Sequence, residues 1–276
     1  MLTDYHVHLR PDDHGAAASS AFTRENAERY LAVAEERGIG ELGVAEHIYR
    51  FEDSLRIWDH PFWREWASDD LGEYCRFVRE ETTLRLGIEA DFVPGREDHT
   101  QNLLEEHDWD YVIGSVHFLR NEAVDIDGEW DIWNRRGEPE DVWTRYFEWV
   151  GEAARSGLFD VLAHPDLVKV WGGERPQPEG DLRRFYERAM DGIAESDVAI
   201  EVSTAGLRKP VGEIYPARAF LEMCLEAGRP VSLSSDAHVP DQLGYRYEQA
   251  LELLSDLGVG EVAVYERRQR RMEPIG

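Results

Sequence analysis

The first fourteen residues carry three histidines in a pattern that suits metal binding. His6 and His8 lie in a segment, residues 2–9, whose composition predicts a β-strand, and side chains two residues apart on a strand point to the same side. His14 follows in a loop containing Pro and Asp, close enough in sequence to fold back toward the pair. Neutral imidazoles that converge in this way are ligands for a transition metal. The alternative is a chance His-x-His pair on a surface strand, so the prediction depends on what the rest of the chain supplies.

Further ligand-type side chains recur at the ends of later predicted strands. They are His47, Glu89, His117, His164, Asp236 and His238. Histidine with carboxylate is a ligand set suited to Zn, Mn or Fe rather than to Ca or Mg. With the three N-terminal histidines there are nine candidates, too many for one ion and enough for three. A carboxylate has two oxygens, so Glu89 could bridge two metals about 3.5–4 Å apart.

Segments with the patterns of strands and helices alternate along the whole chain. Strands are predicted at residues 2–9, 41–48, 84–93, 111–119, 161–168, 198–204 and 230–238, with a short final strand at 261–265. Helices are predicted at residues 24–37, 69–83, 96–106, 140–156, 181–195, 217–227 and 242–257. Two long loops, residues 49–68 and 121–137, follow strands rather than helices. In a barrel of parallel strands, that is the end at which active sites lie.

This alternation favours an α/β fold in which helical crossovers join parallel strands. Seven such units indicate a closed (β/α)7 barrel, which would bring the candidate ligands together at the C-terminal ends of the strands. An open doubly wound sheet is the alternative, but no Gly-x-Gly-x-x-Gly follows the first strand. No shift in composition marks a second domain, so residues 1–276 are predicted to form one domain.

Charge and composition argue against some classes of binding partner. The chain has 30 basic and 57 acidic side chains and a net charge of −27, which argues against binding to nucleic acid or to an anionic membrane. No apolar run approaches a membrane span, and the N-terminus lacks the pattern of a signal peptide. Cys75 and Cys224 match no metal or redox spacing. We therefore expect a cytoplasmic protein that acts on a small molecule, whereas its oligomeric state cannot be inferred.

The candidate ligands stand in motifs that resemble those of the polymerase and histidinol phosphatase (PHP) superfamily. In chain order these are Asp-x-His-x-His with a third His six residues on, a strand-two His, Gly-Ile-Glu, Ser-Val-His, Ala-His-Pro-Asp and Ser-Asp-Ala-His. The resemblance implies a distorted seven-stranded barrel that holds three metals. Carried over residue by residue, it implies one metal on His6, His8, Glu89 and Asp236. It implies a second metal on Glu89, His117 and His164, and a third on His14, His47 and His238.

A narrower resemblance covers nearly the whole chain and points to the PHP-type histidinol-phosphatases. Residues 203–216 (Ser-Thr-Ala-Gly-Leu-Arg-Lys-Pro-Val-Gly-Glu-Ile-Tyr-Pro) are similar to a signature of that group. Residues 87–95, 113–118 and 164–169 are similar to the same group. The resemblance implies a histidine-biosynthetic enzyme that hydrolyses L-histidinol phosphate. The chain departs from the group in its low lysine content and in Lys169, where arginine is expected.

The implied reaction is metal-assisted hydrolysis of a phosphomonoester. The metals, with Glu89 as their bridge, would activate water and clamp the phosphoryl oxygens. Arg208 is the first candidate for a fixed cation on the phosphate, because guanidinium binds phosphate in a bidentate fork, and Lys169 is a second candidate. Phe118 could stack on the substrate's imidazole, and an acidic residue near the mouth could pair with its amine. Asp236 or a water held by the metals could donate the proton to the leaving group.

Three alternatives remain open on the sequence. A PHP phosphoesterase could act on another small phosphate ester, such as a nucleotide or a sugar phosphate. A PHP module could bind metal without catalysis, but such modules lack ligands and this set is intact. Amidohydrolases also begin with His-x-His, but many of them bridge their metals with a carboxylated lysine at the end of strand four. Neither Lys169 nor Lys209 lies there.

Overall fold

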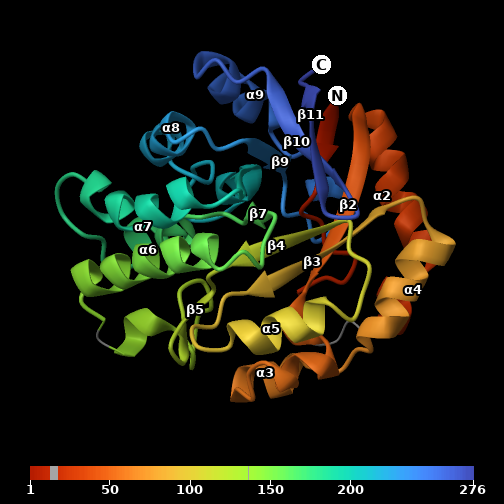
Figure 1. Ribbon diagram of the computed structural model, residues 1–276, viewed down its shortest axis with the longest axis horizontal. Coiled ribbons are helices and arrows are strands. Elements are labelled where there is room, and N and C mark those ends of the chain that lie inside the picture. Colours follow the sequence, from red (N-terminus) through yellow and green to blue (C-terminus); the bar gives the residue numbers. More distant parts are fainter. Residues whose placement is uncertain (13–17, 136) are drawn as a thin grey trace.

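Seven parallel strands form the central sheet in a computed structural model that describes residues 1–12, 18–135 and 137–276 (Figure 1). Their order is β1 (Leu2–Asp4), β2 (Ile39–His47), β3 (Arg85–Asp91), β4 (Tyr111–Ser115), β7 (Val161–Leu162), β8 (Ala199–Ser203) and β9 (Val231–Ser234). Beyond β1 and β9, Val7 and Ala237 form a parallel bridge, in which the amide of His8 donates to the carbonyl of Ala237 at 2.8 Å. The sheet thereby curls into a nearly closed barrel, and the predicted distorted (β/α)7 barrel is confirmed.

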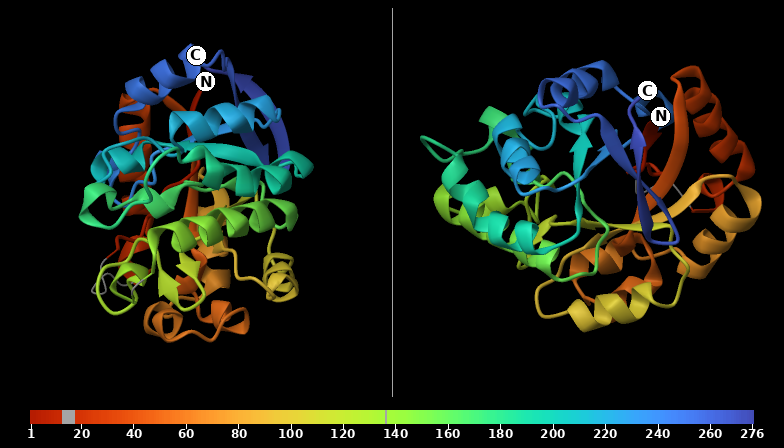
Figure 2. Two further views of the ribbon diagram at one scale, coloured as in Figure 1. Left: turned by 90° about the vertical axis from the view of Figure 1, so that its left-hand side faces the viewer. Right: turned by 45° about the horizontal axis from the view of Figure 1, so that its top comes forward.

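Helices surround the strands on the outside, as the two views of Figure 2 show. The longer ones are α2 (Arg24–Glu36), α4 (Leu71–Glu81), α5 (Glu97–Leu104), α6 (Pro139–Arg155), α7 (Arg183–Glu195), α8 (Arg218–Glu226) and α9 (Tyr247–Asp256), and the short ones are α1 (Ala18–Ala21) and α3 (Pro61–Trp66). Side chains cap the N-termini of α2 and α4: Thr23 Oγ1 accepts from the amide of Asn26, and Asp70 Oδ1 accepts from that of Glu73. His60 Nδ1 caps the short α3 in the same way, by accepting from the amide of Phe62. None of these helices combines the length and apolar composition that crossing a membrane requires.

We call the N-terminal end of the barrel the floor, and there aromatic side chains fill its inside. Tyr5 packs edge-on against Tyr111 and Tyr265, with ring centroids 4.9 and 6.0 Å apart. Tyr265 comes from β10 (Glu261–Glu266), which pairs antiparallel with β11 (Gln269–Pro274). The final strand was expected, whereas its partner β11 was missed. Its residues are polar and largely exposed, so they lack the apolar alternation that marks a strand.

Two glycines make room for the central ring of the floor. A Cβ atom at Gly43 would lie 2.4 Å from Tyr111 Oη, and one at Gly87 would lie 2.3 Å from Tyr111 Cζ. Real atoms do not approach so closely in a packed interior, so any larger side chain would displace the ring. Two glycines on β2 and β3 thus set where Tyr111 can lie.

The structure corrects several predicted boundaries near the mouth, the C-terminal end of the barrel. The first strand ends at Asp4 rather than at Leu9. Beyond Asp4 the chain bonds to a different neighbour on each side: the carbonyl of Val7 accepts from the amide of Ala45, and the amide of His8 donates to the carbonyl of Ala237. The predicted strand 111–119 is interrupted, and its end forms the small hairpin β5 (Phe118–Leu119) and β6 (Glu122–Ala123). The expected loop 49–68 contains α3. Short 3₁₀ helices lie at Ile48–Arg50, Glu52–Arg56, Ile132–Arg135, Leu167–Lys169, Gly172–Glu174, Thr204–Arg208 and Pro240–Gln242.

Candidate metal centre and adjoining cavity

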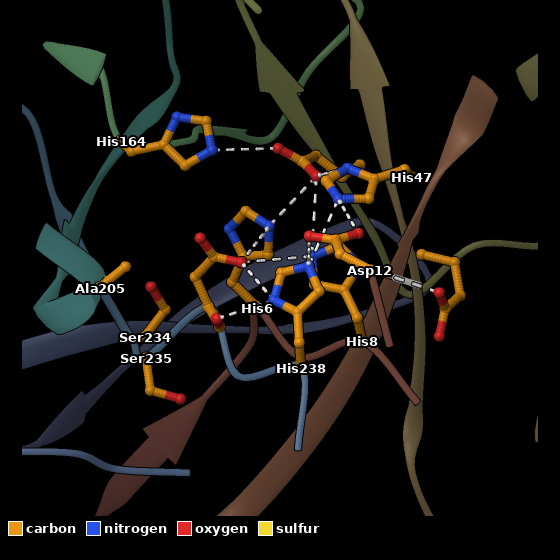
Figure 3. A network of polar contacts seen from close by, with 12 residues as sticks. His6, His8, Asp12, His47, His164, Ala205, Ser234, Ser235 and His238 are labelled. Atoms are coloured by element: carbon orange, nitrogen blue, oxygen red, sulfur yellow. Dashed lines mark hydrogen bonds and ion pairs between the residues drawn. The ribbon is translucent and has the colours of Figure 1, made fainter. Parts of the chain in front are cut away.

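The mouth of the barrel gathers eight of the nine candidate ligands, and the ninth, His14, lies outside the described residues. His6 and His8 follow β1, His47 and Glu89 lie on β2 and β3, and the others follow later strands. The gathered residues are His6, His8, His47, Glu89, His117, His164, Asp236 and His238. Figure 3 shows the imidazoles of His6, His8, His47 and His238 converging, with His164 approaching from the opposite side. Residues up to 232 positions apart, such as His6 and His238, thus share one centre.

Glu89 lies at the centre of this cluster and faces histidines with both oxygens. Its Oε2 lies 2.5 Å from His47 Nδ1 and 3.3 Å from His6 Nε2. Its Oε1 lies 3.1 Å from His164 Nε2 and 3.3 Å from His117 Nε2. The carboxylate therefore has one oxygen toward each of two histidine groups, which is the geometry that a bridging ligand needs.

Asp236 faces a second part of the cluster. Its Oδ1 lies 3.4 Å from His8 Nε2, 3.7 Å from His6 Nε2 and 3.6 Å from His238 Nδ1. His47 Nε2 and His238 Nε2 are 3.5 Å apart. Four overlapping groups of three residues each offer ligand atoms that lie within 4.8 Å of one another. The groups are His8–His47–His238, His6–Glu89–His164, His6–His8–Asp236 and His47–Glu89–His117.

The buried carboxylates make the cluster an electrostatically favourable place for positive charge. Burial opposes ionisation of Glu89, but His47, His6 and His117 outweigh it and hold the pKa of Glu89 well below its ordinary value. Burial likewise opposes ionisation of Asp236, and His6 and His8 hold its pKa well below its ordinary value. At His47 burial dominates and lowers the pKa to about 3 despite the neighbouring Glu89. A neutral imidazole at His47 has a lone pair to offer to a cation.

Several of these atoms are buried and have no hydrogen-bond partner among the described residues. They include Nε2 of His6, Nε2 of His8 and Oδ1 of Asp236. Unpaired buried polar atoms are costly, so a group of them that points inward indicates a partner that binds there. Imidazole nitrogens with carboxylate oxygens are the donor set of Zn, Mn and Fe sites. These residues therefore fit divalent transition-metal ions.

The three expected ligand sets differ in how fully the structure brings them together. The first set, His6, His8, Glu89 and Asp236, converges through the contacts above. In the second set both histidines approach Glu89 Oε1. In the third set, the ring nitrogens of His47 and His238 approach each other, and Asp12 Oδ2 lies 2.9 Å from His238 Nε2. Asp12 was missed by sequence reasoning, although its place two residues before His14 could have indicated it.

A buried carboxylate that the sequence analysis missed, Glu201 on β8, holds two of the ligands from behind. Its Oε1 lies 2.7 Å from His6 Nδ1, and its Oε2 accepts from the amide of His164 at 2.6 Å. Ser234 Oγ also donates to Oε1, at 2.7 Å. Such a contact fixes both the tautomer and the direction of a ligating imidazole. A glutamate inside the apolar run of residues 198–204 was the available signal.

Two other ligands are held in a similar way. Asp91 Oδ1 lies 2.9 Å from His117 Nδ1, so the Nε2 atom of His117 is directed at Glu89. Asp236 lies in a turn with φ of 51°, a left-handed conformation that a non-glycine residue adopts at a cost. Arg208 Nη2 donates to the carbonyls of Ser235 and Asp236, both at 2.9 Å, and Asp4 accepts from the amide of Ser235 at 2.9 Å. These bonds hold the strained turn in place.

A cavity of about 310 Å³ adjoins the cluster, the size of a small-molecule site. Five of its lining residues are candidate ligands, and most of the others are apolar or aromatic. The lining residues are Asp12, His47, Tyr49, Phe62, Trp66, His117, Phe118, Asp125, Ile126, His164, Leu167, Val170, Lys209, Tyr215, Asp236 and His238. Phe118, the candidate for stacking on a substrate ring, is therefore part of this wall.

The two candidate cations for the substrate differ in their surroundings. Arg208 uses Nη2 for the turn at Asp236, while its Nη1 is buried and has no hydrogen-bond partner among the described residues. Lys169 Nζ is held by Asp166 at 2.9 Å and by Glu213 at 3.2 Å, and among the described residues that line the cavity we find Lys209 instead. Neither Arg208 nor Lys169 is among the residues that line the cavity, whereas Lys209 is, so both predicted substrate contacts stay predictions.

Comparison with known proteins agrees with this arrangement. The PHP domain family model matches residues 5–205. A probable histidinol-phosphatase of Deinococcus radiodurans is 35% identical over 99% of both chains, and the histidinol-phosphatase of Bacillus subtilis is 24% identical over 90% of this chain and 98% of the relative. A histidinol phosphate phosphatase of Lactococcus lactis, solved with zinc, L-histidinol and phosphate, superposes with a TM-score of 0.72 at 17% identity over 98% of both chains.

Proposed function

The chain belongs to the PHP domain family, and from this premise we propose that it is a metal-dependent phosphatase that converts L-histidinol phosphate to L-histidinol and phosphate. The observation that carries the proposal is a cavity of small-molecule size that is lined by five of the eight converging candidate ligands. The full-length similarity to a probable histidinol-phosphatase supports the choice of substrate. The reaction is a step of histidine biosynthesis, and we infer that it takes place in the cytoplasm.

We propose three divalent transition-metal ions, Zn, Mn or Fe, in the centre. The first would be held by His6, His8, Glu89 and Asp236, and the second by Glu89, His117 and His164. The third would be held by His14, His47 and His238. Asp12 is an additional candidate for the third position because of its contact with His238. When bound, these ions supply an activated water and Lewis acidity toward the phosphoryl oxygens.

The chain's own residues orient the reacting groups. Glu201 and Asp91 keep the imidazoles of His6 and His117 in the tautomer that directs Nε2 into the centre. Arg208 has a buried donor, Nη1, to offer to a phosphoryl oxygen while its other arm holds the Asp236 turn. Asp236 lines the cavity and is a candidate to pass a proton to the leaving oxygen, but its low pKa leaves it ionised, so it would first have to accept that proton.

We also propose that residues 1–276 act as one functional unit. The family model matches only to residue 205, but β9, Asp236 and His238 follow that limit and complete the barrel and its ligand cluster. The β10–β11 hairpin closes the floor through Tyr265. Loss of the segment after residue 205 would therefore remove both candidate ligands and core.

The test is a phosphate-release screen over L-histidinol phosphate, nucleotides and sugar phosphates, with protein loaded with Mn, Zn or Fe and with chelator-treated protein as the control. We expect turnover of L-histidinol phosphate that disappears on chelation and returns with metal. Preference for a nucleotide or a sugar phosphate would favour the alternative PHP phosphoesterase. Absence of turnover on every ester by fully metallated protein would contradict the proposal.

A further inference from the structure

Apart from the candidate ligands and Asp12, the lining of the cavity combines flat apolar surfaces with a carboxylate. The apolar surfaces come from Tyr49, Phe62, Trp66, Phe118 and Ile126, and the carboxylate is Asp125. The aromatic rings suit a flat, weakly polar group. An acidic side chain among them would be costly to bury unless a polar partner meets it.

Asp125 is poorly matched by its protein neighbours. Its Oδ1 is buried and accepts no hydrogen bond from the described residues. Burial raises the pKa of Asp125, and the charges of His117, His164 and Lys209 act against that rise. Glu201, a buried carboxylate of the same barrel mouth, by contrast has three polar contacts. The unpaired oxygen therefore indicates a donor that arrives with the substrate.

The position of Asp125 relative to the metal centre is fixed by the backbone. The β5–β6 hairpin carries His117 just before its first strand and Asp125 just after its second. Between them, the amide of Val124 donates to the carbonyl of His117 at 2.9 Å, and the carbonyl of Val124 accepts from Trp171 Nε1 at 2.8 Å. The same hairpin thus positions the candidate ligand His117 and the carboxylate of Asp125, so a substrate can contact the metal centre and Asp125 at the same time.

We propose that Asp125 accepts a hydrogen bond from the protonated amino group of the substrate, so that the cavity selects phosphate monoesters that carry an ammonium group. The inference rests on the proposed function and names its specificity residue. An ammonium group is charged at neutral pH and has three donors. The neutral imidazole has one donor and a flat face, so it suits the aromatic wall better than the carboxylate.

The test compares Asp125→Asn with the parent on two esters, L-histidinol phosphate and p-nitrophenyl phosphate, which lacks an amine. The ratio of kcat/KM between the two esters should fall about tenfold or more in the variant, as for the loss of a hydrogen bond to a charged group. Asp127→Asn is the matched control, because Asp127 lies on the same loop, is exposed and pairs with Arg175 at 2.8 Å. For Asp127→Asn, the ratio of kcat/KM between the two esters should stay within about twofold of the parent's ratio.

Product inhibition separates the amine from the ring. L-histidinol has both groups, whereas 4-(hydroxymethyl)imidazole has the ring without the amine. Asp125→Asn should weaken inhibition by L-histidinol about tenfold, with much less change for the second compound. An unchanged ester ratio, or equal weakening of both inhibitors, would overturn the assignment of Asp125. Failure of the parent to hydrolyse either ester would instead contradict the proposed function.

Discussion

The two ends of the barrel treat their buried carboxylates in opposite ways. At the floor, Asp110 accepts from the amide of Leu86 at 2.9 Å and from Arg79 at 2.6 Å. Asp160 accepts from the amide of Val112 at 2.8 Å and from Arg268 at 2.9 Å. At the mouth, Glu89 instead faces histidine nitrogens, and its Oε2 has no hydrogen-bond partner among the described residues.

This difference divides the same strands into a stabilising half and a functional half. Near their start, β3 and β4 pack Tyr111 against Gly87; near their end, β3 and the segment after β4 present Glu89 and His117 to the mouth. Groups that satisfy one another lower the free energy of the folded chain, whereas unpaired polar groups raise it and are retained where a ligand meets them. Substitutions at the two ends should therefore separate stability from activity.

The largest effect is expected at Glu89, where the two halves of the ligand cluster meet. Glu89→Gln keeps the size of the side chain but removes its charge, and a neutral amide bridges two cations poorly. We expect kcat/KM for L-histidinol phosphate to fall by well over the roughly 100-fold typical of losing a residue behind a ligand. Elemental analysis should find less metal per chain. Full metal content with normal turnover would exclude Glu89 as the bridge.

At the floor, Gly87→Ala should change stability and leave the chemistry of folded molecules intact. The added methyl group would lie 2.3 Å from the Tyr111 ring, which is buried and cannot move aside. Overpacking of this kind should lower the free energy of unfolding by about 3 kcal/mol, measured by urea denaturation. Gly173→Ala, where a Cβ atom meets nothing within 4 Å, should stay within about 0.5 kcal/mol.

A Gly87→Ala chain as stable as the parent would mean that the floor is less tightly packed than the structure indicates. Loss of activity at full stability would mean that the floor and the mouth are not independent. Both measurements belong on the same preparation, because unfolded molecules lower apparent activity.

Asp91 tests how much the mouth depends on residues behind its ligands. Asp91 lies two positions after Glu89 on β3 and is not among the nine candidate ligands, so the sequence alone gives no reason to expect a large effect there. The structure instead pairs Asp91 Oδ1 with His117 Nδ1 at 2.9 Å in a buried position. Asp91→Asn should therefore weaken metal binding or kcat/KM by about 10- to 100-fold. Asp98→Asn on the exposed face of α5 is the control, and equal behaviour of the two variants would remove Asp91 from the site.

The sequence predicted the barrel and the side chains that gather at its mouth because each prediction rests on a local pattern. His47 and Glu89 lie at strand ends that apolar runs already mark, and the closed barrel follows from repeated strand–helix units. Partners such as Glu201 and Asp125 depend on contacts between residues far apart in the chain. Glu201 contacts His6, 195 positions away, and no local pattern encodes such a pair. For the same reason the ion pairs of Lys169 with Asp166 and Glu213 could not be read from the sequence.

The smallest effect is expected at Arg208, which links the mouth to the phosphate. Arg208→Ala should lower kcat/KM for L-histidinol phosphate by about tenfold or more, about the 1.5–3 kcal/mol of a hydrogen bond to a charged group. Arg208→Lys should recover only part, because lysine lacks the bidentate fork. The inhibition constant of inorganic phosphate distinguishes two roles. If Nη1 binds the phosphoryl group, phosphate inhibition weakens while metal content stays constant; if Arg208 only holds the Asp236 turn, metal content falls and the proposed phosphate contact is wrong.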